Sequence, residues 1–495
     1  MVDNGYDVQD YREIDPSFGT MADMDELIAR GREKGVRVVM DLVFNHTSER
    51  CPWFQESRKS RDNDYADWYI WRDAKPDGSE PTNWRSIFGG SAWAWCEERQ
   101  QYYLHTFAPQ QPDLNWENPD VRRALIDIAL FWVAKGVGGF RIDAITYIKK
   151  PAVFADGPAD GEDGLYPVHA ATANTPGILD FLHEFKAAVR DGRDIFFVGE
   201  ANGVAAEELG AWVGERGVFD MLFEFSHTHV PMGAAEVWCR PAQWTLTDLK
   251  SALSASQANT ADNGWYPIFF ENHDQPRSTV NFFRCEGPAA AKAKALGTVL
   301  LTLRGTPFVM QGEELGYSNR AWGSVDEFDD LQTRSKYEFA LQEGFTADQA
   351  LAACNRFSRD NARTPMQWDA TRNAGFSTAD VTWLPVHHDY ATVNVEAESA
   401  DPDSPLSWYR RLGNLRSQRD ELVCGTYEEL MADDEQVYAF RRQGEDAASV
   451  VLANLSAEAA SYDASLVEGM RLLAGTHGTS EPGVLRPFEA VVFGL

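Results

Sequence analysis

The chain has 495 residues, and its 45 lysine and arginine residues against 76 aspartate and glutamate residues give a formal net charge of −31. A hydrophobic share of 44% supplies apolar material for a large core and excludes wholesale disorder. The excess of acid argues against a nucleic-acid protein and against docking on anionic lipid, because both need clustered cations.

The cysteines and the first residues of the chain indicate its compartment. The six cysteines are scattered with no CxxC pair, which favours neither a zinc site nor a disulfide framework. No apolar run approaches the roughly 20 residues that a membrane helix needs. The first residues, MVDNGYDVQDY, lack the pattern of a signal peptide. We therefore expect a cytoplasmic protein with no metal or cofactor and no membrane or nucleic-acid partner.

Six short apolar runs alternate with longer amphipathic stretches in chain order. The runs are residues 36–44, 138–145, 195–199, 218–225, 266–271 and 307–311, and the amphipathic stretches include residues 24–34, 121–135 and 289–303. Near-continuous apolar strands that alternate with helices predict a parallel sheet covered on both faces, here a (β/α)8 TIM barrel of the α/β class. Polar side chains stand at the C-terminal ends of these runs, where such a barrel gathers its active site.

Two regions break this alternation and predict the domain boundaries. Residues 47–113 are rich in Trp, Tyr, Pro, Gly and charge, and from about residue 425 short alternating strands appear. We expect a catalytic barrel at 1–46 and 114–422, an inserted subdomain at 47–113 after the third strand, and a C-terminal antiparallel β-domain of sandwich type at 423–495.

Four strand ends carry candidate catalytic side chains: DLVFNH from Asp41, GFRIDA from Gly139, VGE ending in Glu200, and ENHDQPR with His273 and Asp274. Arg141 and Asp143 are two apart on a strand, so they point to the same face, and the Arg favours the charged carboxylate that a nucleophile needs. Glu200 follows an apolar strand, where desolvation would raise its pKa as a general acid requires.

Each of these features alone is also typical of a structural ion pair, a surface carboxylate or a pair of hydrogen-bonded loop residues. Their order along the chain favours function, because each stands at the expected C-terminal edge of a different barrel strand. The four motifs in this order resemble the α-amylase superfamily (glycoside hydrolase family 13), as do PDLNWENP (112–119) and RGTPFVMQGEELG (304–316). DNGYDVQDY (3–11) and SRDNARTPMQWD (358–369) resemble its oligo-1,6-glucosidase and α-glucosidase branch.

The resemblance implies a role for each matching residue. Asp143 would be the nucleophile, Glu200 the general acid/base, and Asp274 the carboxylate that stabilises the transition state. The residues implied in binding the sugar or orienting the nucleophile are Asp3, Tyr6, His46, Arg141, His273 and Arg359. This is a retaining double displacement on a small oligosaccharide, and it requires the two reacting carboxyl groups to be about 5–5.5 Å apart.

The bond that is cut stays open at this point. Ala144 after the nucleophile departs from the Val of α-1,6-acting members of the branch, whereas GEANGV (199–204) resembles its dextran-glucosidase members. The insertion at 47–113 is expected to narrow the barrel mouth to a pocket, which favours exo cleavage of terminal glucose.

Alternatives to the α-glucosidase are a sucrose isomerase or another glucosyl-transferring member, and a phosphotrehalose hydrolase, for which no dedicated cationic cluster is evident. A non-catalytic scaffold is disfavoured because the chain keeps Asp143, Glu200 and Asp274. Members of this family also begin well upstream of the DNGYD segment, with the first two barrel strands and a calcium loop. The resemblance therefore predicts a barrel without those strands, from a fragment or a start codon assigned too late.

Overall fold

The computed structural model describes residues 2–232 and 237–495. By its internal contacts the chain divides into two compact units. The first comprises Met1–Phe225 with Asp262–Trp265, and the second comprises Ser226–Ala261 with Tyr266–Leu495.

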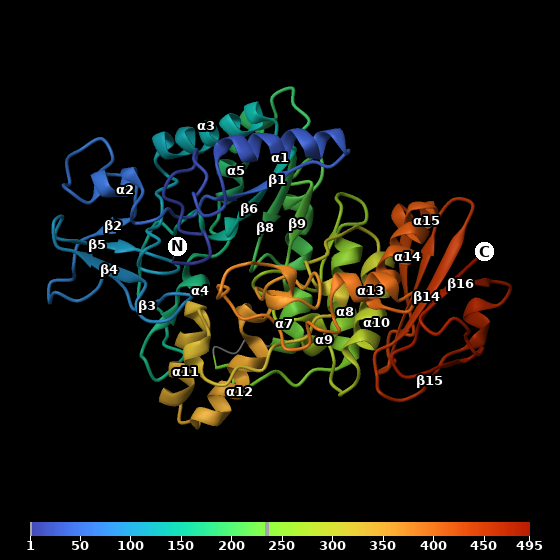
Figure 1. Ribbon diagram of the computed structural model, residues 1–495. Helices are drawn as coiled ribbons and strands as arrows, with labels where there is room; N and C mark the ends of the chain where they lie inside the picture. Colours follow the sequence, from blue (N-terminus) through green and yellow to red (C-terminus); the bar gives the residue numbers. More distant parts are fainter. Residues whose placement is uncertain (1, 233–236) are drawn as a thin grey trace. The chain divides into compact units, whose positions relative to one another are not determined.

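The first unit is built on a parallel sheet whose strand order is β1-β6-β8-β9 (Figure 1). The strands are β1 (Val39–Val43), β6 (Gly139–Asp143), β8 (Phe196–Glu200) and β9 (Met221–Phe223). Val43 is paired with Asp143 and Glu200 with Phe223, so neighbouring strands end at the same edge of the sheet. These are four of the six predicted runs, with β9 shorter than expected.

Three longer helices pack on this sheet. They are α1 (Met21–Glu33), α3 (Pro119–Lys135) and α5 (Ile178–Arg190). Thr20 forms a capping box at the start of α1, and α3 ends at Gly136, whose left-handed φ of 100° suits glycine. The buried side of each helix joins one core with Phe140 and Phe197, so the predicted amphipathic stretches in this unit are confirmed.

The region 47–113 contributes short elements to the first unit. It holds α2 (Pro52–Ser57) and an antiparallel sheet in the order β2-β5-β4, made of β2 (Trp71–Arg72), β4 (Trp93–Cys96) and β5 (Gln101–Leu104). β3 (Trp84–Arg85) pairs in parallel with β7 (Tyr166–Pro167). Trp84 and Trp93 lie in a small core that also includes Val168, from outside this region. The remaining α-helices of this unit are α4 (Val168–Thr172) and α6 (Leu209–Trp212).

The second unit contains the other two predicted runs as a short parallel pair, β10 (Pro267–Ile268) and β11 (Thr306–Pro307). Both strands are shorter than expected, and each includes a proline, which has no N–H to donate to a sheet. Its helices are α7 (Ser226–Met232), α8 (Leu246–Asn259), α9 (Ser278–Asn281), α10 (Ala289–Thr302), α11 (Leu331–Gln342), α12 (Ala347–Phe357), α13 (Val395–Ala400), α14 (Pro405–Ser417) and α15 (Asp420–Val423).

A five-stranded antiparallel sheet ends the second unit, in the order β12-β13-β14-β18-β16. Its strands are β12 (Thr426–Leu430), β13 (Val437–Gln443), β14 (Ala448–Asn454), β16 (Arg471–Gly475) and β18 (Ala490–Gly494). One face shares a core with α10 and α14, and the other packs against the short antiparallel pair β15 (Ala460–Ser461) and β17 (Val484–Leu485). Every residue of β14 is buried, as expected of a strand covered on both faces.

Within the described residues, no helix combines the length and the apolar character needed to cross a bilayer. All six cysteine thiols are free.

Candidate active site

The guanidinium of Arg141 is the centre of a carboxylate cluster at the C-terminal edge of the first unit's sheet. Its Nη1 donates to both oxygens of Asp41 at 2.9 Å and to Asp143 Oδ1 at 2.5 Å. Its Nη2 pairs with Glu200 Oε2 at 2.7 Å. Asp41, Arg141 and Glu200 come from β1, β6 and β8, so three adjacent strands meet at one cation. The contact expected between Arg141 and Asp143 is present, and Asp143 and Glu200 lie close enough to bind the same guanidinium.

The backbone after the nucleophile candidate holds Glu200 in place. Ala144 has a left-handed φ of 46° and donates its N–H to Glu200 Oε2 at 3.0 Å. A non-glycine residue in this conformation costs about 1 kcal/mol, and such strain persists where surrounding contacts over-determine it. The same strained residue thus ends the Asp143 strand and orients the Glu200 carboxylate.

Burial and like charge determine the electrostatics of this cluster. The side chain of Asp143 is 10% exposed. Its pKa is raised well above the ordinary value because desolvation outweighs the favourable charge of Arg141, while Glu200 and Asp41 add negative charge. Burial alone would lower the pKa of Arg141, but Asp41 and Glu200 raise it well above its usual range. Arg141 therefore stays charged.

Tyr6 and Asp41 support the same cation. The Tyr6 hydroxyl donates to Asp41 Oδ2 at 2.7 Å, and the Arg141 guanidinium carbon lies 5.7 Å from the centre of the Tyr6 ring. The motif analysis did not single out Asp41 as a site residue. The register between β1 and β6 places Asp41 directly opposite Arg141, and this pairing identifies Asp41 as a member of the cluster.

His46 and Asp3, both implied in sugar binding, are joined by Gln111. His46 is 1% exposed, and its Nε2 lies 2.9 Å from the Tyr6 carbonyl oxygen and 3.1 Å from Gln111 Nε2. Gln111 also donates to Asp3 Oδ2 at 3.3 Å. Burial lowers the pKa of His46, which favours a neutral imidazole. The sequence analysis missed Gln111, which lies at the end of the 47–113 region.

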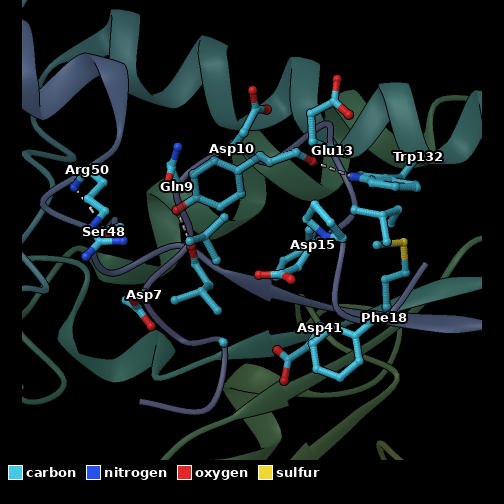
Figure 2. Close-up of a pocket in the computed structure, with 18 residues that line it drawn as sticks. Asp7, Gln9, Asp10, Glu13, Asp15, Phe18, Asp41, Ser48, Arg50 and Trp132 are labelled. Atoms are coloured by element: carbon cyan, nitrogen blue, oxygen red, sulfur yellow. Dashed lines mark hydrogen bonds between the residues drawn. The ribbon is translucent and has the colours of Figure 1, made fainter. Parts of the chain in front are cut away.

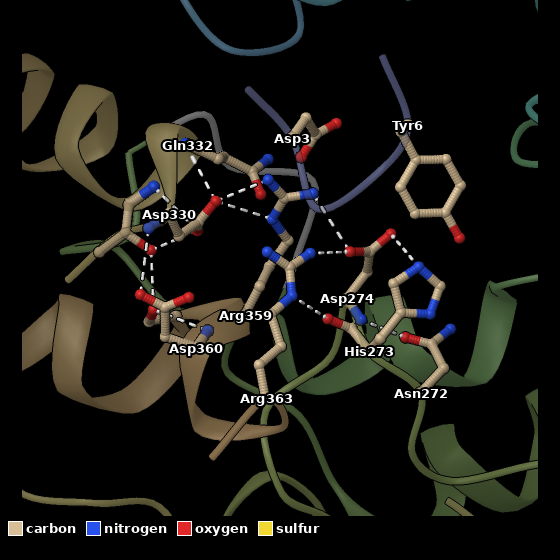
Figure 3. Close-up of polar contacts among 12 residues, drawn as sticks. Asp3, Tyr6, Asn272, His273, Asp274, Asp330, Gln332, Arg359, Asp360 and Arg363 are labelled. Carbon is tan, nitrogen blue, oxygen red and sulfur yellow. Dashed lines mark hydrogen bonds and ion pairs between the residues drawn. The ribbon is translucent and has the colours of Figure 1, made fainter. Parts of the chain in front are cut away.

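The second unit holds the other three candidates, Asp274, His273 and Arg359 (Figure 3). Asp274 Oδ1 accepts from Arg359 Nη1 at 3.1 Å and from Arg363 Nη2 at 2.6 Å. Arg363 Nε also donates to the His273 carbonyl oxygen at 2.8 Å. Two guanidinium groups therefore orient the Asp274 carboxylate, and the His273 ring nitrogen lies 3.5 Å from its other oxygen.

Arg363 was not among the expected site residues, although the signal was present. It follows Arg359 by four residues in SRDNARTPMQWD, and both cations reach the same carboxylate oxygen. Of the nine expected residues, the structure groups Asp143, Glu200, Arg141, Asp3, Tyr6 and His46 in the first unit, and Asp274, His273 and Arg359 in the second.

A cavity of about 540 Å³ in the first unit lies beside Asp41 (Figure 2). Its lining includes Tyr11, Phe18, Met40 and Trp132 but neither Asp143 nor Glu200. Carboxylates also line it (Asp7, Asp10, Glu13, Asp15 and Asp41), but it contains neither of the two residues that the sequence motifs assign to catalysis in this unit.

No group of three or more His, Cys, Asp or Glu side chains is placed to hold a metal ion among residues 2–232 and 237–495.

We predict that Arg141→Ala destabilises the protein strongly. Without the Arg141 guanidinium, three carboxylates face one another, and two of them are largely buried. Removing one partner of a buried ion pair lowers the free energy of unfolding by about 3 kcal/mol or more. Urea denaturation followed by circular dichroism measures the change. The matched control is Arg37→Ala, because Arg37 pairs with Asp194 at a site where the two side chains are 62% and 85% exposed. Equal unfolding midpoints for both variants would contradict the central role of Arg141.

Comparison with known proteins identifies the family. Residues 1–425 match the model of the alpha-amylase family, described as "Alpha amylase, catalytic domain". The chain belongs to the alpha-amylase family. An oligo-1,6-glucosidase of Heyndrickxia coagulans is 42% identical over 499 residues, covering 100% of this chain and 89% of the relative. An α-glucosidase of Pediococcus pentosaceus is 38% identical over 500 residues, covering 100% and 89%.

Solved structures agree with this assignment. The trehalulose synthase of Pseudomonas mesoacidophila MX-45 superposes with a TM-score of 0.92 at 36% identity, covering 99% of this chain and 89% of that one. The trehalose-6-phosphate hydrolase of Bacillus licheniformis gives a TM-score of 0.89 at 35% identity, with the same coverages of 99% and 89%. These matches confirm the predicted family, the barrel fold class with its C-terminal antiparallel sheet, and a glycoside hydrolase as the kind of enzyme.

Proposed function

We propose that this alpha-amylase-family enzyme is a retaining, exo-acting α-glucosidase that releases terminal glucose from short α-glucosides in the cytoplasm. The observation that carries the proposal is the Arg141 cluster, in which one guanidinium binds both Asp143 and Glu200. Two carboxyl groups that share one guanidinium suit a nucleophile and an acid/base acting on the same bond, as the retaining mechanism requires. The relatives named oligo-1,6-glucosidase and α-glucosidase support the substrate class.

The proposed reaction has two steps. Asp143 attacks the anomeric carbon as Glu200 gives its proton to the leaving oxygen, which forms a glucosyl ester and releases the aglycone. Glu200 then takes a proton from water, which attacks the ester and frees glucose with its configuration retained. Arg141 contacts both carboxylates and orients them before each step.

We assign the role of transition-state stabiliser to Asp274, because its motif resembles the one that carries this residue in the family. Its carboxylate is held by Arg359 and Arg363, which leaves little freedom to rotate. A fixed negative group of this kind stabilises positive charge that develops at a sugar ring. His46, His273, Asp3 and Tyr6 are the proposed contacts to the terminal glucose.

A panel of four disaccharides tests this function. We expect glucose release from maltose and isomaltose at rates within about tenfold of each other, because the small Ala144 side chain leaves room for either aglycone. The measurement is kcat/KM for both, with product identification on sucrose and trehalose. Near-absolute preference for isomaltose would contradict the argument from Ala144, and no glucose from any of the four would overturn the function.

A glucosyl-transferring enzyme is the second candidate, favoured by the superposition on a trehalulose synthase. The same glucosyl ester would then be attacked by the fructose released from sucrose instead of by water. An isomeric disaccharide as the main product from sucrose identifies this activity. Hydrolysis of a phosphorylated trehalose, suggested by the relative from Bacillus licheniformis, is tested by adding that substrate to the panel.

A further inference from the structure

Asp330 is a carboxylate sealed inside the second unit, at the start of α11. Its side chain is 0% exposed. It caps the helix: Oδ1 accepts the N–H of Gln332 at 3.2 Å, and Oδ2 accepts the N–H of Thr333 at 3.1 Å. The Thr333 hydroxyl donates to the same Oδ2 at 2.5 Å. A helix cap needs no charge, because asparagine and serine serve as well at this position. A buried negative group here therefore has a further partner.

That partner is Arg359 (Figure 3). Its Nε and Nη2 donate to Asp330 Oδ1 at 2.9 Å and 2.6 Å. Burial alone would raise the pKa of Asp330, but the charge and the hydrogen bonds of Arg359 lower it, so the carboxylate stays ionised. Both ions of this pair are almost fully desolvated, since the Arg359 side chain is 8% exposed.

The pairing decides where the third nitrogen of Arg359 points. A guanidinium is planar, so two nitrogens fixed on one oxygen leave a single direction for the third. That nitrogen, Nη1, lies 3.1 Å from Asp274 Oδ1. Asp330 thus determines, through a rigid group, one of the two cations that orient Asp274.

The turn that carries Arg359 is tied to the same place. Asp360 Oδ2 accepts the backbone N–H groups of Asp329 and Asp330 at 2.8 Å and 3.0 Å. The Thr333 hydroxyl lies 2.8 Å from Ser358 Oγ. These bonds join the two ends of the helical hairpin α11–α12. They keep Asp330 and Arg359 in direct contact, although the two residues are 29 apart in the sequence.

We propose that Asp330 is a positioning residue for the glycosidase reaction, which orients Asp274 by holding the Arg359 guanidinium. The inference rests on the proposed function, because it takes Asp274 as the transition-state stabiliser. Asp330 itself touches no substrate in this scheme.

The test is the variant Asp330→Asn, assayed with an aryl α-glucoside. An amide has one acceptor oxygen, so it cannot satisfy both Arg359 and the helix cap. We expect kcat to fall about 100-fold, as small displacements of catalytic groups do, while KM changes less than about threefold. The control is Thr346→Ala, which removes the capping box at the start of α12 in the same hairpin and leaves Arg359 untouched. It should lower the melting temperature without lowering kcat.

A double-mutant cycle separates positioning from general stability. If Asp330 acts through Arg359, the double variant Asp330→Asn, Arg359→Ala has the same kcat as Arg359→Ala alone. If the losses in kcat of the two single variants multiply in the double variant, or if a folded Asp330→Asn variant has wild-type kcat, the inference is overturned.

If Asp330→Asn does not fold, the variant Asp330→Glu takes its place. It keeps the negative charge and changes only the position of the carboxylate, and wild-type kcat in this variant would refute the inference. An inactive wild-type protein would instead refute the proposed function, and the inference with it.

Discussion

Replacing Asp143 with asparagine lowers glucose release by about 10⁴-fold or more if Asp143 is the nucleophile. The amide keeps the size of the side chain but cannot form the glucosyl ester, and loss of such a group removes the two-step route entirely. The amide also replaces the carboxylate that accepts from Arg141 Nη1 at 2.5 Å in the native site. Initial rates on maltose and on an aryl α-glucoside measure the effect, with circular dichroism to verify folding.

The control for this prediction is Asp194→Asn, a change of the same chemistry in the same unit at a side chain that is 85% exposed. Wild-type rates are expected there. A second variant, Asp143→Ala, leaves space for azide, which should restore turnover and give a glucosyl azide of inverted configuration. Activity within tenfold of wild type in Asp143→Asn would remove Asp143 from the mechanism.

Replacing Glu200 with glutamine separates the two halves of the reaction. Glutamine still accepts the N–H of Ala144 but has no proton to give, so kcat on maltose should fall about 10³-fold. With an aryl glucoside whose leaving group needs no protonation, the rate of the first step, formation of the glucosyl ester, should fall far less. Pre-steady-state measurement of the released aryl group would then show a burst, because the ester forms faster than water removes it.

Glu184→Gln is the matched control, since Glu184 pairs with Arg122 on the outside of the first unit and is 44% exposed. Its rates should equal those of the wild type on both substrates. If the rate of the first step falls equally on maltose and on the activated glucoside in Glu200→Gln, Glu200 does not act as the acid.

Local sequence patterns predicted many of the strands and helices in both units. Strand periodicity placed Arg141 and Asp143 on one face of β6, and that contact is present. The amphipathic stretches became α1, α3 and α10, which start and end within a few residues of the expected positions. The runs near Pro267 and Pro307 were overestimated as strands, because periodicity does not register the N–H that proline lacks.

The contribution of the insertion was less predictable. The small core that holds Trp84 and Trp93 is not confined to the 47–113 region, because Val168 belongs to it and Trp84 stacks on Phe154. Trp53 stacks on Tyr11, also outside the region, and Trp95 is 42% exposed. Composition identifies a tryptophan-rich segment, but which ring is covered depends on how the segment folds back on its neighbours.

By itself the amino-acid sequence determined the fold class, the family and the positions of the candidate carboxylates, because each depends on spacing within a short segment or on the order of segments. Only the tertiary structure decided that Arg141 also binds Asp41 and Glu200, and that Asp330 holds Arg359. The physical reason is that these partners come from segments far apart in the chain. Their contact depends on the register between parallel strands and on the return of a helical hairpin, and neither leaves a local periodic signal.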